Sequence, residues 1–121
     1  MQETIHDRNG SAVAYVDYDD ESTIYMWNGK PVGYLDQNNK VYGFNGKHLG
    51  WYEDGILWNL QGERSGFNKN ACPVFTKFEP FKSFKQFKPF KSFKEFAKFK
   101  PFKKTIVSAT SLEQHLMSGS K

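Results

Sequence analysis

The stretch from Ile24 to Asp36, IYMWNGKPVGYLD, places Asn28 and Gly29 between two apolar runs. Asn-Gly in this setting is the strongest short-range sign of a β-hairpin, because a type I′ turn needs positive φ at both central residues. Three further segments align with it without gaps: IHDRNGSAVAYVD (residues 5–17), VYGFNGKHLGWYE (residues 41–53) and LWNLQGERSGFNK (residues 57–69). The sequence therefore predicts four consecutive hairpins, with structural turn glycines at Gly10, Gly29, Gly46 and Gly62.

Pairing across these turns gives each hairpin two different faces. One face pairs an aliphatic residue with a small one: Ile5 with Ala14, Ile24 with Gly33, Val41 with Gly50, and Leu57 with Gly66. The other face is mainly aromatic, with Tyr25, Trp27, Val32 and Tyr34 in the second hairpin and Tyr42, Phe44, Leu49 and Trp51 in the third. Because glycine lets another backbone approach closely, we expect the small sides to converge inward and the aromatic residues to fill the spaces between hairpins.

The repeated NGKPVGYLD and NGKHLGWYEDGILW units, followed by a Lys/Pro-rich run and a short Ser-led end, resemble the small bacterial domain called the four-fold beta flower. The resemblance covers most of residues 1–117. It implies an all-β fold with quasi-fourfold organisation and no settled activity. The fourth unit departs from the pattern, with Gln61 in place of Asn, Ser65 in place of an apolar residue and Lys69 in place of an acid. Terminal repeats are often atypical in this way.

Beyond the hairpins, phenylalanine occupies every third position from Phe75 to Phe102, and lysine usually follows it. An α-helix would smear such a pattern around all its sides, and the prolines within the run also disfavour a helix. Polyproline II has three residues per turn and accepts proline. We therefore expect an extended rod with its phenylalanine edge turned inward and its lysine edge toward acid or water. The predicted assembly ridge comprises Phe81, Phe84, Phe87, Phe90, Phe93, Phe96, Phe99 and Phe102.

Charge divides the chain in the same place. Residues 1–76 carry a balance of −4, and residues 77–104 carry +8. The rod should therefore lie on its own domain or meet an outside anion. We divide the chain into a four-hairpin β domain (1–70), an extended segment (71–104) and a C-terminal part (105–121). In that last part, Ser111 and Gln114 form a weak capping box ahead of a short helix.

No motif supplies a recognisable catalytic or metal site. The three histidines show no ligand spacing, the lone Cys72 cannot make a zinc site, and nothing in the sequence places serine beside histidine. Asp17, Asp36 and Glu53 recur at one repeat position, and we expect them to end strands and solvate the hairpin mouths, or to pair with tail lysines. We expect no enzyme, no cofactor and no metal.

The favoured hypothesis is a non-enzymatic assembly or binding module whose tail joins copies into a homo-oligomer, with a tetramer among the options. One alternative is binding of single-stranded nucleic acid or an anionic membrane surface through Lys85, Lys88 and Lys91. We favour nucleic acid less, because the acidic hairpins would repel it. Another alternative is binding of a small ligand or glycan by aromatic residues, namely Trp27, Trp51, Trp58, Tyr34 and Tyr52.

The polar start MQETIHDRNG and the lack of a long apolar run predict a cytoplasmic protein without a transmembrane segment.

Overall fold

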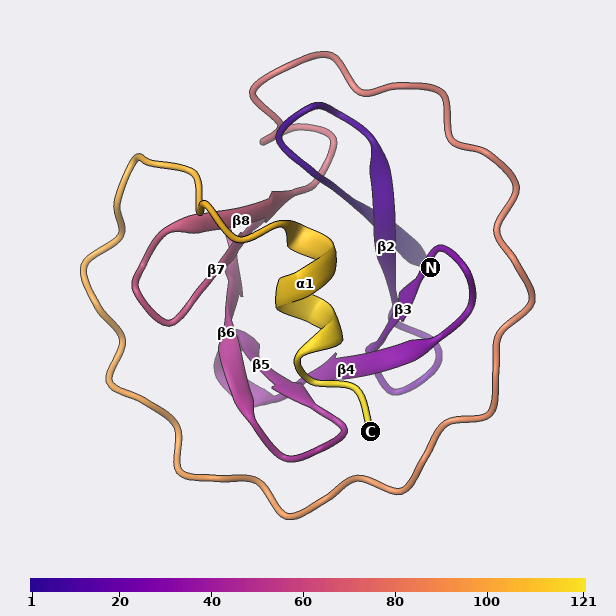
Figure 1. Ribbon diagram of the computed structural model, residues 1–121, viewed down its shortest axis with the longest axis vertical. Coiled ribbons are helices and arrows are strands. Elements are labelled where there is room, and N and C mark those ends of the chain that lie inside the picture. Colours follow the sequence, from indigo (N-terminus) through magenta and orange to yellow (C-terminus); the bar gives the residue numbers. More distant parts are fainter.

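Eight antiparallel strands close into one barrel, and a short helix lies across one opening of it (Figure 1). This computed structural model describes all 121 residues. The strands are β1 (Gln2–His6), β2 (Ala12–Asp17), β3 (Thr23–Met26), β4 (Pro31–Leu35), β5 (Lys40–Gly43), β6 (His48–Glu53), β7 (Ile56–Trp58) and β8 (Arg64–Phe67). A 3₁₀ turn, η1 (Gln37–Asn39), joins β4 to β5, and the helix is α1 (Leu112–Met117). The all-β class and the short C-terminal helix are confirmed.

Each strand pairs with its neighbours in the chain, and a single pair between His6 and Phe67 closes the barrel. Within the hairpins, the aliphatic residues lie opposite the small ones: Ile5 with Ala14, Ile24 with Gly33, Val41 with Gly50, and Leu57 with Gly66. These four pairs place large and small side chains on the same, inner face.

The turns differ from the predicted type I′ geometry. Gly29 has a φ of 92° and Gly46 a φ of 89°, but the asparagines before them are not among the residues with positive φ. The amide of Gly29 donates to the carbonyl of Met26 (2.8 Å), and the register shifts between Ile24 and Tyr25. This is the pattern of a three-residue loop, a type I turn followed by a glycine in a β-bulge. The prediction of a two-residue turn was therefore wrong.

The bulge changes which face some residues occupy. Val32 and Leu49, which we expected beside the aromatic residues, lie in the barrel interior with Ile24 and Val41. The bulge changes the face only beside the turn, because further along the strands Gly33 still lies opposite Ile24 and Gly50 opposite Val41, as expected. Most aromatic residues of the hairpins lie on the outer face of the barrel, where they form separate clusters, whereas Tyr52 belongs to the interior cluster.

The helix α1 completes the interior. Ser111 caps it, and its hydroxyl accepts a hydrogen bond from the amide of Gln114 at 3.1 Å. Leu112 and Leu116 are buried in the same cluster as the interior residues of the strands. A six-residue helix is too short to be stable alone, so packing against the barrel must stabilise it.

Candidate functional site

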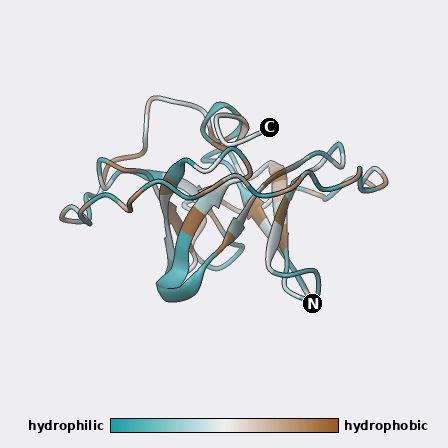
Figure 2. Cartoon of the chain, turned by 90° about the horizontal axis from the view of Figure 1, so that it is seen from below, coloured by the Kyte–Doolittle hydropathy of each residue, from teal (hydrophilic) through white to brown (hydrophobic).

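Residues 75–104, here called the belt, run around the outside of the barrel without forming a strand or a helix (Figure 1). Figure 2 shows the belt as a band across the molecule, with α1 on one side and most of the strands on the other. The belt contacts its own chain, so the extended segment lies on the hairpins from which it extends.

Backbone hydrogen bonds fasten the belt to the four turns at regular intervals. The amides of Lys77, Gln86, Glu95 and Lys104 donate to the carbonyls of Gly10, Gly29, Gly46 and Gly62, over 2.8–2.9 Å. The donors are nine residues apart, so three Phe-Lys-x triplets span the distance from one hairpin to the next. The period of three in the sequence therefore matches the fourfold arrangement of the barrel.

The four turn glycines have a second role besides shaping the turns. A Cβ atom on Gly29 would overlap the carbonyl oxygen of Phe84, and a Cβ on Gly46 would overlap that of Phe93. Gly10 and Gly62 meet the belt carbonyls of Phe75 and Phe102 in the same way. Each glycine thus makes room for the belt backbone.

All the belt phenylalanines point into solvent. Their side chains are 92–102% exposed: Phe75, Phe78, Phe81, Phe84, Phe87, Phe90, Phe93, Phe96, Phe99 and Phe102. Our expectation that the phenylalanine edge faces inward was therefore wrong. We call these ten side chains the phenylalanine rim; it contains the whole predicted ridge and two further residues at its start.

Lysines take the inward edge instead. Lys94 pairs with Asp36 at 2.5 Å, and Lys103 pairs with Glu53 at 2.9 Å. Lys85 forms the equivalent pair with Asp17. The hydrogen bond from Lys85 lowers the pKa of Asp17, and that from Lys94 lowers the pKa of Asp36. The three recurring carboxylates pair with tail lysines, one of the two roles expected for them.

Aromatic rings on the outer face of the barrel hold further lysines. Lys91 lies over the ring of Tyr34, with its Nζ 4.1 Å from the ring centroid. Lys82 lies over Trp27 at 5.1 Å in the same manner. These are cation–π distances. We call the outer surface under the belt the wall; it includes Tyr15, Asp17, Trp27, Tyr34, Asp36, Tyr42, Glu53 and Trp58.

The three lysines predicted to contact an outside anion instead make contacts within the chain. Lys85 pairs with Asp17, Lys88 pairs with Asp20 at 2.7 Å, and Lys91 covers Tyr34. The aromatic residues proposed for ligand binding are distributed differently. Trp27 is half-buried beneath the belt, and the other four are buried: Tyr34, Trp51, Tyr52 and Trp58.

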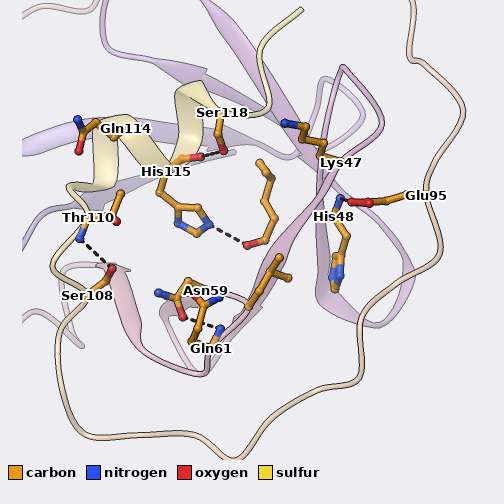
Figure 3. Close-up of a pocket in the computed structure, with 12 residues that line it drawn as sticks. Lys47, His48, Asn59, Gln61, Glu95, Ser108, Thr110, Gln114, His115 and Ser118 are labelled. Atoms are coloured by element: carbon orange, nitrogen blue, oxygen red, sulfur yellow. Dashed lines mark hydrogen bonds between the residues drawn. The ribbon is translucent and has the colours of Figure 1, made fainter.

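A separate polar pocket of about 280 Å³ lies between α1, the turns around Gly46 and Gly62, and the belt (Figure 3). Its polar lining includes Lys47, Glu95, Gln114 and His115. His115 is the most constrained of these side chains. Its Nε2 donates to the carbonyl of Leu49 at 2.8 Å, so its Nδ1 accepts from the hydroxyl of Ser65 at 2.6 Å.

The sequence did not allow the contact between Ser65 and His115 to be predicted, because 50 residues separate the two. Both imidazole nitrogens have partners, and Ser65 is only 4% exposed. Burial lowers the pKa of His115, which keeps the ring neutral. This geometry holds α1 on the barrel, and it does not present the serine hydroxyl to a substrate.

A second pocket has an acidic lining that includes Glu3, Glu53 and Asp54. The carboxylate of Glu3 accepts hydrogen bonds from the hydroxyls of Tyr18 (3.0 Å) and Tyr52 (2.8 Å) and from the amide of Asn68 (3.2 Å). Its oxygens are therefore engaged within the protein.

No group of three or more His, Cys, Asp or Glu side chains in the chain is arranged to hold a metal ion. The chain's only α-helix, α1, has six residues and is too short to cross a bilayer.

Comparison with known proteins agrees with this geometry. The family model described as 4-fold beta flower protein matches residues 3–116. The chain belongs to this beta flower family. The match extends from the first hairpin through the belt to α1, so the belt lies inside the beta flower unit. No curated protein and no solved structure matches this beta flower chain.

Proposed function

We propose that the protein is a non-enzymatic assembly module whose phenylalanine rim joins copies edge to edge. The observation that carries this proposal is the orientation of the belt: ten phenylalanines are exposed while the lysines between them face the wall. The exposed rings pack against nothing within the chain, so they are available to a partner.

The size of the rim supports an interaction surface. A phenylalanine side chain offers roughly 150–250 Å², so ten fully exposed ones present on the order of 1,500–2,500 Å². The largest apolar patch on a typical monomer is about 300–600 Å². The summed area of the rim is several times larger, although it is distributed around the belt over separate side chains.

Its curvature favours other copies as the partner. We expect the belt to keep the polyproline II rise of about 3.1 Å per residue; nine residues per hairpin then give a perimeter near 110 Å and a diameter near 35 Å. Two such convex rims touch over about three phenylalanines each, which buries roughly 900–1,500 Å² in total, enough for a weak to standard interface. A rim exposed on all sides supports several neighbours, so a tetramer and larger edge-to-edge arrays both fit its geometry.

Two other partners fit the rim less well. Chain segments with hydrophilic residues lie on either side of the belt (Figure 2). A flat bilayer could reach the whole rim only by burying them, and burial of polar groups is costly. Single-stranded nucleic acid would need lysines free for phosphates. Lys85 and Lys88 are paired with carboxylates of the barrel.

Sedimentation of the full chain tests the proposal. We expect the mass of the wild type to rise with concentration, and a variant with all ten rim phenylalanines changed to serine to remain monomeric. The control changes Ser83, Gln86 and Ser92, which share the belt but not the rim, to alanine, and it should assemble like the wild type. Identical masses for the wild type and the serine variant would refute the proposal, provided that tryptophan fluorescence shows both to be folded.

A further inference from the structure

The wall contacts the belt in a register that repeats every nine residues. Lys85, Lys94 and Lys103 are nine residues apart, and they pair with the equivalent carboxylates of three hairpins. The belt amides that bond the turn carbonyls are also nine residues apart. Backbone and side-chain contacts therefore share one spacing.

Lysine is the residue type whose side chains contact the wall. Each paired ammonium group meets a carboxylate, and several also lie over a tyrosine or tryptophan ring; for example, Lys94 lies 5.3 Å from the centroid of Tyr42 while pairing with Asp36. The phenylalanine side chains contribute nothing to this contact, because they are 92–102% exposed. A peptide would thus be recognised by its backbone and by the spacing of its lysines.

We propose that the wall is a recognition surface for extended, lysine-rich peptides and that the belt of a second copy is a ligand it takes. The proposal rests on the proposed function only in so far as assembly brings copies together. Charge complementarity points to this occupant, since residues 1–76 carry −4 and residues 77–104 carry +8. An identical belt also reproduces every contact of the chain's own belt, including the nine-residue register.

Exchange of belts costs little in contacts. The belt holds the barrel through hydrogen bonds, ion pairs and cation–π contacts and buries no apolar side chain against it. It is joined to the chain through residues 68–74 and 105–111, which contain no helix or strand. Swapping identical elements between copies leaves the interactions unchanged and alters only the chain connectivity. Edge-to-edge contact of the rims raises the local concentration of the second belt, which favours the exchange.

The first test uses a fluorescent peptide of residues 81–104 and the full chain with Lys85→Gln, Lys94→Gln and Lys103→Gln, which loosens the protein's own belt. Fluorescence polarisation should show binding of this peptide. A peptide of the same composition, with its lysines alternately two and four residues apart, should bind roughly tenfold more weakly. A peptide with every phenylalanine changed to serine should bind like the native one. Equal binding of the respaced peptide, loss of binding by the serine peptide, or no binding of any peptide would overturn the proposal.

The second test needs no variant that could fail to fold. Wild-type protein with and without ¹⁵N is mixed at high concentration and treated with a carbodiimide, which joins paired lysines and carboxylates. Products linking Lys94 of one isotope to Asp36 of the other are expected, and a mixture containing Asp36→Asn should lack them. If rims associate but every product joins a chain to itself, the belt of a second copy does not occupy the wall. Because the serine peptide binds without a rim, failure of rim-driven assembly and failure of wall recognition are distinguishable.

Discussion

At the scale of single residues, ten phenylalanine side chains lie in solvent while the lysines between them contact the barrel. The wall explains this arrangement, because its carboxylates and aromatic faces both attract ammonium groups. Phenylalanine would leave Asp17, Asp36 and Glu53 without the lysines that now pair with them. Satisfying buried and half-buried charge therefore outweighs burial of the apolar edge within the single chain.

Substitutions of phenylalanine should separate the rim from the core. Phe87→Ser should change the free energy of unfolding by no more than about 0.5 kcal/mol, because Phe87 is fully exposed. Phe44→Ser should cost on the order of 3–5 kcal/mol, because Phe44 is buried to 1% exposure. Chemical denaturation followed by tryptophan fluorescence measures both. A large loss for Phe87→Ser would mean that the rim packs within the chain.

Substitution of Gly29 should destabilise the protein for two separable reasons. Gly29→Ala should cost about 1–2 kcal/mol for its positive φ, besides displacing the belt carbonyl of Phe84. Asparagine tolerates positive φ but still carries a Cβ, so Gly29→Asn isolates the contact with the belt. Hydrogen exchange at the amide of Gln86, which bonds Gly29, should rise in both variants. Unchanged exchange in Gly29→Asn would show that the glycine serves the turn alone.

At the scale of elements, the hairpins, the belt and α1 are held together by different forces. The barrel and α1 share an apolar interior, whereas the belt is attached by hydrogen bonds, ion pairs and cation–π contacts. The belt should therefore detach under conditions that leave the barrel folded.

Acid should release the belt before it unfolds the barrel. Hydrogen bonds from lysines lower the pKa of Asp17, Asp36 and Glu53 in the folded chain, so their stabilising contribution is complete above their unfolded pKa of about 4. It is lost as pH falls through the folded values. Hydrogen exchange at Gln86 and Glu95 should thus be slow at pH 6 and, after correction for intrinsic rate, much less protected at pH 3. Asp36→Asn should weaken protection at neutral pH; equal protection at both pH values would contradict the role of these pairs.

The docking of α1 should weaken at a higher pH than that of the belt. Burial lowers the pKa of His115, so its contribution is complete above the unfolded histidine pKa of about 6.5 and declines as pH falls below it. Protonation of Nδ1 would remove its ability to accept from Ser65. Protection of the amide of Leu116 should decrease between pH 7.5 and pH 5. His115→Asn should abolish that dependence, and an unaltered pH profile in this variant would refute the assignment.

At the scale of the whole molecule, the protein is a barrel with a charged attachment surface and a hydrophobic perimeter. The belt joins the two, since one edge of it faces the wall and another forms the rim. Attachment of the belt to the wall and assembly through the rim should therefore respond to added salt in opposite ways.

Salts should separate these two responses. Sodium chloride near 1 M reduces the Debye length to about 3 Å and should increase hydrogen exchange along the belt. Sodium sulfate strengthens apolar association and should increase the sedimenting mass of the wild type. The variant with ten serines should keep the first response and lose the second. A decrease of assembly in sulfate would exclude the rim as the contact surface.

Several features could be predicted from particular residues. The turn glycines and the aliphatic–small pairs follow from local pairing rules, and the structure shows them at the predicted positions. The capping role of Ser111 is likewise local. The bulge could not be predicted from the Asn-Gly signal, because both turn types accept asparagine followed by glycine at these positions and differ in loop length, in the φ of the asparagine and in how the strands meet. The Ser65–His115 contact depends on where α1 docks, which no local pattern encodes.

The sequence by itself determined the strict period of three, which places the phenylalanines on one edge if the backbone has three residues per turn. It also determined the acidic barrel and the basic belt, which attract each other. Only the tertiary structure decided which edge faces the barrel. That choice depends on the wall, where carboxylates and aromatic rings from different hairpins converge on the lysines and leave the phenylalanines in solvent.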